Sequence, residues 1–198
     1  MNFSDTEIEH LTKAWIAISL AFAILLSGRD IFSSNFGSML LVSGFTVGLG
    51  FVLHELGHKY VAQRYNCFAE FRAFNGMLIL AILMSFLGFI FAAPGAVMIN
   101  GYVNREKNGK ISAAGPIINL GLAVIFIGLI LIGFVNMFTH YGLLINSWLA
   151  TFNMIPFWNL DGKKILRWNK VVYFSMLGLG ITFLILSSVL WYVHNSYK

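Results

Sequence analysis

Residues 52–59 read Val-Leu-His-Glu-Leu-Gly-His-Lys, and this stretch decides how the rest of the chain is interpreted. In a helix, His54 and His58 lie one turn apart on the same face, so both imidazoles can bind one ion. Zinc takes nitrogen ligands at this spacing, and Glu55 beside them can accept and release a proton. Residues 39–53 contain no charged side chain, so this metal site is expected at the end of a membrane-spanning helix.

The composition predicts an integral, multi-pass membrane protein in a lipid bilayer. Hydrophobic residues make up 58% of the chain and charged residues 11%, against about 25% charged residues in soluble domains. The net charge of +5 comes from Lys and Arg dispersed between apolar segments, so it indicates topology and no nucleic-acid partner is expected. No polar stretch is long enough for a second domain, so we expect residues 1–198 to form a single membrane-embedded domain.

The apolar segments predict an all-α polytopic protein with about five full transmembrane helices. The expected spans are residues 11–28, residues 36–63, two crossings within residues 111–160 that break near 136–141, and residues 171–193. Ser112 is a candidate N-cap for the first of the two crossings, with Pro116 in its first turn. Residues 66–76 and 96–103 indicate a small interfacial β segment or loops.

The second of these segments is rich in glycine, at positions 37, 44, 48 and 50. Small residues let neighbouring helices approach closely, and flexibility is the alternative interpretation.

A catalytic zinc site needs a third protein ligand, and Asp161 is the best candidate. It is the first charged residue after 50 uncharged positions, residues 111–160, and a carboxylate oxygen binds zinc at about 2.0–2.2 Å. An equal alternative is that Asp161 caps the following helix and faces the cytosol beside Lys163. The residues alone leave both interpretations open.

Three motifs occur in order along the chain: HELGH at residues 54–58, GPxxN at 115–119 and NxxPxxxLDG at 153–162. This pattern resembles the site-2 protease family of intramembrane zinc metalloproteases over roughly residues 40–165. The resemblance implies a catalytic core over about residues 36–165 that holds one Zn²⁺ per chain. The chain resembles a minimal form of this family, without a PDZ or CBS module. The apolar stretch 77–93 departs from the family pattern.

The resemblance also implies roles for individual residues. His54, His58 and Asp161 correspond to the zinc ligands, and Glu55 to the catalytic glutamate. Asn153 corresponds to an asparagine that helps to hold the substrate or the developing oxyanion. The implied partner is a transmembrane protein substrate, and the oligomeric state is unknown.

The ligand positions decide how residues 77–93 must be interpreted. If that segment crosses the membrane, His58 and Asp161 end on opposite faces of a core about 30 Å thick and cannot share an ion. If it dips in and returns at Pro94-Gly95, eleven of the 13 Lys and Arg residues share one side, against Arg29 and Lys198. The positive-inside rule favours this second topology, with a re-entrant element and the active site near the cytosolic side.

The predicted function is zinc-dependent hydrolysis of a peptide bond in or near a transmembrane segment. Residues 96–103 could offer a strand edge to an unwound substrate, or form an interfacial hairpin with no substrate role. One alternative is a non-catalytic membrane scaffold or metal-handling protein. Another is a membrane metallopeptidase with a glutamate as third ligand, which Glu70 and Glu106 fit poorly because neither lies in an apolar helical segment.

Overall fold

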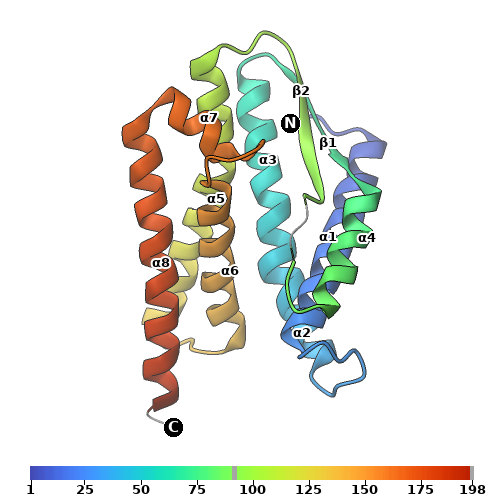
Figure 1. The fold of residues 1–198 in the computed structure, drawn as a ribbon, viewed down its shortest axis with the longest axis vertical. Helices are drawn as coiled ribbons and strands as arrows, with labels where there is room; N and C mark the ends of the chain where they lie inside the picture. Colours follow the sequence, from blue (N-terminus) through green and yellow to red (C-terminus); the bar gives the residue numbers. More distant parts are fainter. Residues whose placement is uncertain (91–92, 197–198) are drawn as a thin grey trace.

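The computed structural model describes residues 1–90 and 93–196, which form seven helices and two strands (Figure 1). In chain order the elements are α1 (Asp5–Leu26), α2 (Phe36–Ser43), the π-helix η1 (Gly44–Gly48), α3 (Leu49–Arg64), β1 (Phe68–Ala73), α4 (Asn75–Phe86), β2 (Gly95–Asn100), α5 (Arg105–Leu131), α6 (Met137–Asn153), α7 (Asp161–Trp168) and α8 (Lys170–Ser196). α2, η1 and α3 continue into one another and count as one helix. Positions 91–92 of the segment 77–93 and Lys198, both used in the topology prediction, lie outside the described residues.

Four helices in the described chain are long and apolar enough to cross a membrane. They are Asp5–Leu26, Phe36–Arg64, Arg105–Leu131 and Lys170–Val193, with 22, 29, 27 and 24 residues. At about 1.5 Å per residue, even the shortest exceeds a hydrocarbon core about 30 Å thick. The prediction of a mostly helical, multi-pass membrane protein is therefore confirmed, but four helices meet this length criterion where about five were expected. α6 has only 17 residues.

α5 begins about two turns earlier than the sequence indicated, so the prediction of a helix start near Ser112 is wrong. Its N-cap is Asn104, whose side chain accepts a hydrogen bond from the Lys107 N–H at 2.8 Å. The first turns are further supported by an ion pair between Glu106 and Lys110 at 2.6 Å. Pro116 therefore lies inside the helix, where it removes one backbone hydrogen bond without ending the helix.

β1 and β2 form an antiparallel two-stranded sheet, in agreement with the predicted β segment. Ala73 pairs with Gly95, and the Phe74 N–H donates to the Pro94 carbonyl at 2.9 Å. The chain that leaves the sheet through α4 therefore returns to the same end of the same sheet (Figure 1). α4 has 12 residues, or about 18 Å of helix.

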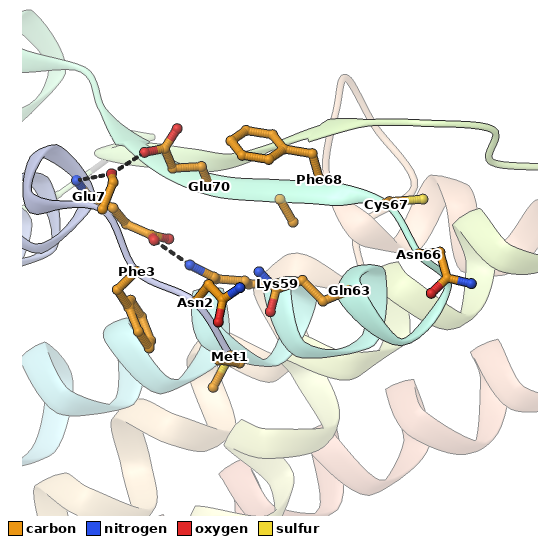
Figure 2. A pocket seen from close by; sticks show the side chains of 12 residues that line it. Met1, Asn2, Phe3, Glu7, Lys59, Gln63, Asn66, Cys67, Phe68 and Glu70 are labelled. Carbon is orange, nitrogen blue, oxygen red and sulfur yellow. Dashed lines mark hydrogen bonds and ion pairs between the residues drawn. The ribbon is translucent and has the colours of Figure 1, made fainter.

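A buried polar cluster fastens α1 to the sheet and to α3 (Figure 2). The Lys59 ammonium contacts the Glu7 carboxylate, and both side chains are 1% exposed. The second Glu7 oxygen accepts the Phe71 N–H at 2.9 Å, and Ser4 donates to Glu70. Lys59 follows the second histidine of the HELGH motif directly, so this cluster also fixes the end of the helix that carries the motif.

Close helix approach explains part of the glycine pattern. A Cβ on Gly48 would lie 2.7 Å from the Trp15 ring of α1, and one on Gly50 would lie 2.5 Å from the Asn146 side-chain oxygen of α6. Gly37 has no atom within 4 Å of its Cβ position. The Trp15 indole also donates to the Gly44 carbonyl at 3.0 Å, at the start of η1. No feature of the sequence pattern predicted this π-helical turn.

Candidate metal centre

α3 brings His54 and His58 together on its buried face. The two side chains are 5% and 8% exposed, and their ring centroids lie 4.7 Å apart. This is the arrangement expected for histidines four residues apart on a regular helix. Both Nε2 atoms face the region between Asp161 of α7 and Gly115 of α5.

Asp161, the first residue of α7, closes the site from the opposite side. Its Oδ2 lies 3.4 Å from Nε2 of His54 and 3.1 Å from Nε2 of His58. Asp161 is 8% exposed, so it faces the imidazoles and not the solvent beside Lys163. A Cβ on Gly162 would overlap the Met154 carbonyl, so glycine at this position lets α7 pack closely against the end of α6.

The protonation of Asp161 suits a metal ligand. Burial by itself would raise the pKa of its carboxyl, but the charges and hydrogen bonds of His58 and His54 outweigh burial. The pKa is therefore held below its usual range. A carboxyl ligates a metal in its ionised form, and this environment favours that form.

The outer nitrogen of each histidine is held by a buried acceptor. His54 Nδ1 lies 2.6 Å from the side-chain oxygen of Asn119, and His58 Nδ1 lies 2.8 Å from the main-chain carbonyl of Ile111. Each Nδ1–H therefore donates a hydrogen bond, and Nε2 is the nitrogen that each histidine directs at Asp161. Zinc-ligating histidines are characteristically oriented by such a second contact.

Gly115 of α5 leaves open the space in front of the ligands. A Cβ at this position would lie 2.5 Å from Nε2 of both His54 and His58. The donor atoms of His54, His58 and Asp161 all lie within 4.8 Å of one another, and no other described residues form such a group. Two imidazole nitrogens and one carboxylate oxygen around an open space fit a tetrahedral zinc ion with one remaining position.

Glu55 is buried at the edge of this group, at 8% exposure. Its carboxylate interacts electrostatically with all three donor side chains, and the Val97 main-chain N–H of β2 is directed at it. The sheet therefore lies directly over the glutamate of the HELGH motif.

Two relatives in the archaeon Methanocaldococcus jannaschii match this chain. The protein named "Putative zinc metalloprotease MJ0611" is 37% identical over 196 residues, which cover 96% of this chain and 97% of that protein. "Zinc metalloprotease MJ0392" is 28% identical over 155 residues, 75% of this chain but only 39% of its own length. No family model and no solved structure matches the chain.

The chain belongs to this family of zinc metalloproteases. The predictions of an enzyme and of zinc as its cofactor are confirmed. The alternative with a glutamate ligand receives no support, because Glu70 pairs with Ser4 and Arg72 and Glu106 pairs with Lys110. The alternative of a non-catalytic scaffold or metal-handling protein also loses support, because the chain belongs to a family of zinc metalloproteases.

Asn153 is the one predicted site residue of this metalloprotease that the structure does not join to the metal group. It is the last residue of α6, and its side-chain amide donates to the Leu149 carbonyl at 2.9 Å. Its predicted role with the substrate or the oxyanion stays a prediction.

The sequence pattern did not predict the contacts that Asn119, Ile111 and Gly115 make with the histidines. GPxxN entered only as part of the resemblance, and the Ile111 main-chain carbonyl has no sequence signal. A surface pocket of about 670 Å³, lined by the N-terminal residues, α3 and β1, contains none of the three donor residues (Figure 2). The metal group, and not this pocket, is therefore the candidate active site of the metalloprotease.

Proposed function

We propose that this metalloprotease is an intramembrane endopeptidase of the site-2 protease family. Its reaction is the hydrolysis of a peptide bond in or near a transmembrane segment of another membrane protein. The observation that carries the proposal is the position of the donor group. His54 and His58 lie within the apolar helix Phe36–Arg64 and are buried among helices of membrane-spanning length. A peptide bond must enter the membrane protein itself to reach such a site.

In the proposed topology, residues 1–198 form one membrane-embedded domain with a catalytic core over about 36–165. α6 is the fifth transmembrane helix, because its 17 residues reach the lower limit of about 17 for a span. The α4 segment is re-entrant. This assignment is supported by the return of the chain to its starting point on the sheet and by the short, 12-residue length of α4.

We assign the active site to the cytosolic side of the membrane. The start of α1, the end of α3, the sheet and the start of α5 lie at one end of the bundle, together with α7 (Figure 1). Most of the Lys and Arg residues belong to these parts of the chain, as the positive-inside rule requires of a cytosolic face.

The substrate is proposed to add to the outer edge of β2 as an extended strand. The Phe71 and Ala73 N–H groups on the far edge of β1 are bound by Glu7 and His10 of α1, so that edge is covered. Phe71 pairs with Val97, and its N–H donates to Glu7 and not to β2. The main-chain groups of Val97 therefore also face away from the partner strand, toward Glu55. A peptide strand bound along β2 would therefore lie beside the catalytic glutamate, and strand addition holds the peptide in its unwound form.

His54, His58 and Asp161 would hold the zinc ion, which supplies a Lewis acid that acidifies water and polarises the scissile carbonyl. A Glu55 carboxylate oxygen takes one proton from the attacking water as the water oxygen bonds to the carbonyl carbon. Glu55 then gives this proton to the amide nitrogen as the carbon–nitrogen bond breaks, leaving a carboxylic acid and an amine. The Asn153 amide, at the end of α6, is assigned to orient the substrate.

The test is Glu55→Gln in the full-length protein, reconstituted with a panel of transmembrane fragments. We expect zinc content to stay at the wild-type level and cleavage to fall by at least about 100-fold, because general acid–base catalysis contributes about 10²–10⁴-fold. Glu106→Gln is the matched control, since Glu106 is exposed and pairs with Lys110, and this variant should cleave normally.

Three outcomes contradict parts of the proposal. An active Glu55→Gln protein removes Glu55 as the base. Wild-type protein that cleaves only soluble peptides is a metalloprotease of another substrate class. Wild-type protein that binds zinc and cleaves no fragment supports a metal-handling role.

A further inference from the structure

A chain of buried side-chain amides connects α6 to the metal centre. Asn146 is fully buried; its Oδ1 accepts from Asn119 Nδ2 at 3.0 Å, and its Nδ2 donates to the Gly142 carbonyl at 2.9 Å. Asn119 also donates to the Gly50 carbonyl at 3.2 Å, and its Oδ1 faces His54 Nδ1 at 2.6 Å. Three helices therefore meet through these amides directly behind one zinc ligand.

The hydrogen bonds that link Gly142, Asn146, Asn119 and His54 can run in only one direction. The Gly142 carbonyl can only accept, so Asn146 must turn its NH₂ toward Gly142 and its oxygen toward Asn119. Asn119 must then turn its NH₂ toward Asn146 and its oxygen toward His54. A neutral His54 consequently carries its proton on Nδ1, so Nε2 is the nitrogen that can offer a lone pair to a metal.

We propose that Asn146 is a positioning residue of the metal centre. It acts through Asn119 to hold His54 in the tautomer that can bind zinc. This inference rests on the assignment of His54 as a zinc ligand. The Gly50 carbonyl favours the same orientation of Asn119, so Asn146 contributes part of the effect and not all of it.

The position of Asn146 gives a second reason for a specific role. Polar side chains inside apolar helices cost free energy when their hydrogen bonds are not made. Asn146 makes its hydrogen bonds only because a carbonyl of its own helix and the Asn119 amide lie at matching positions. A Cβ on residue 50 would lie 2.5 Å from Asn146 Oδ1. Glycine at this position therefore leaves room for Asn146 between the helices.

The test compares the zinc dissociation constants of full-length variants, measured by competition with a chelator. In Asn146→Leu, the Asn119 amide loses one anchor, and we expect about tenfold weaker binding, at the lower end of the 10–100-fold effects of outer-shell contacts. Asn146→Ser should show the same loss, because its hydroxyl can reach the Gly142 carbonyl but not Asn119. This second variant keeps the helix-internal contact, so the inference remains testable where Asn146→Leu does not fold.

Asn146→Asp is the rescue variant. A carboxylic acid buried between helices takes its neutral form, in which O–H donates to Gly142 and C=O accepts from Asn119. Its zinc affinity should stay within about twofold of wild type. Ser147→Ala is the matched control, because Ser147 is equally buried and its hydroxyl donates to the Leu143 carbonyl of its own helix. It should also bind zinc normally.

A double-mutant cycle separates positioning from a general effect on folding. If Asn146 acts through Asn119, adding Asn146→Leu to Asn119→Ala should weaken zinc binding no further. A full additional tenfold loss in that background overturns the proposal, as does wild-type affinity in Asn146→Leu and Asn146→Ser, or a failure of Asn146→Asp to rescue. Wild-type protein that binds no zinc, or binds it unchanged after His54→Ala, refutes the ligand assignment instead.

Discussion

At the scale of single residues, the HELGH spacing was sufficient to predict which histidines face one another, because helix geometry alone fixes positions four apart. The contacts that make them suitable ligands could not be predicted in the same way. His54 is held by Asn119, 65 residues later, and His58 by the Ile111 carbonyl, 53 residues later. Such partners depend on how α5 packs against α3, and a main-chain carbonyl carries no residue signature.

Gly115 offers the sharpest test of the open space between the ligands. In Gly115→Ala, the new Cβ would lie 2.5 Å from both Nε2 atoms and would force one or both imidazoles to move. Because a ligand displaced by even a few tenths of an ångström leaves the range of zinc–nitrogen bonds, zinc affinity should fall by at least about tenfold. The measurement is chelator competition, with helix content recorded by circular dichroism.

Gly121→Ala is the control for this substitution on the same helix. No atom lies within 4 Å of the Cβ position of Gly121, so the alanine meets nothing. It should bind zinc as wild type does and unfold at the same or a slightly higher temperature, since alanine favours helix by about 1 kcal/mol. Equal zinc affinities in the two variants would show that Gly115 does not border the ion.

At the scale of helices and strands, hydropathy located the long helices because a membrane-length apolar run leaves few alternatives. It failed where polar residues continue a helix. The segment 104–110 looks like a loop, yet the Asn104 cap and the Glu106–Lys110 pair make it the first turns of α5. The π-helix η1 could not be predicted from its own residues either, because the Gly44 carbonyl at its start is bound by Trp15 of another helix.

The contact between α1 and α3 carries a prediction about stability. Glu7→Ala would leave the Lys59 ammonium buried without its carboxylate, and removal of one partner of a buried pair costs about 3–5 kcal/mol. We expect a clear drop in the unfolding temperature in detergent, measured by circular dichroism. Glu9→Ala is the control, because the Glu9–Lys13 pair is exposed and screened by solvent, so its loss should leave the unfolding temperature nearly unchanged.

The double variant Glu7→Leu with Lys59→Met distinguishes the buried charge from lost packing. Replacing both partners by apolar side chains is often neutral, so this protein should recover most of the stability lost in Glu7→Ala. If it is as unstable as Glu7→Ala, then the hydrogen bond from Phe71 to Glu7, and not the charge pair, holds α1 in place.

At the scale of the whole molecule, the proposed topology rests on a chemical requirement of the metal centre. His58 and Asp161 can share one ion only if both lie at the same depth, which requires an even number of crossings between them. The structure brings them within 3.1 Å and pairs the strands on either side of α4. What the sequence could not supply is the strand register, because both strands are short and pair across 21 intervening residues, 74–94.

The proposed topology predicts the side of the membrane on which single cysteines are labelled. In a Cys67→Ala background, Arg64→Cys at the end of α3 and Asn108→Cys in the first turns of α5 are both exposed. If the segment between them returns to its starting side, a membrane-impermeant thiol reagent should label both only after the cytosolic face is opened. Phe32→Cys is the control, because Phe32 is 91% exposed in the loop after α1 and a cysteine there should react from outside.

Opposite accessibility of positions 64 and 108 would mean that residues 77–93 cross the membrane. His58 and Asp161 would then be separated by the bilayer and could not bind one zinc ion, so this labelling experiment tests the metal centre and the fold together.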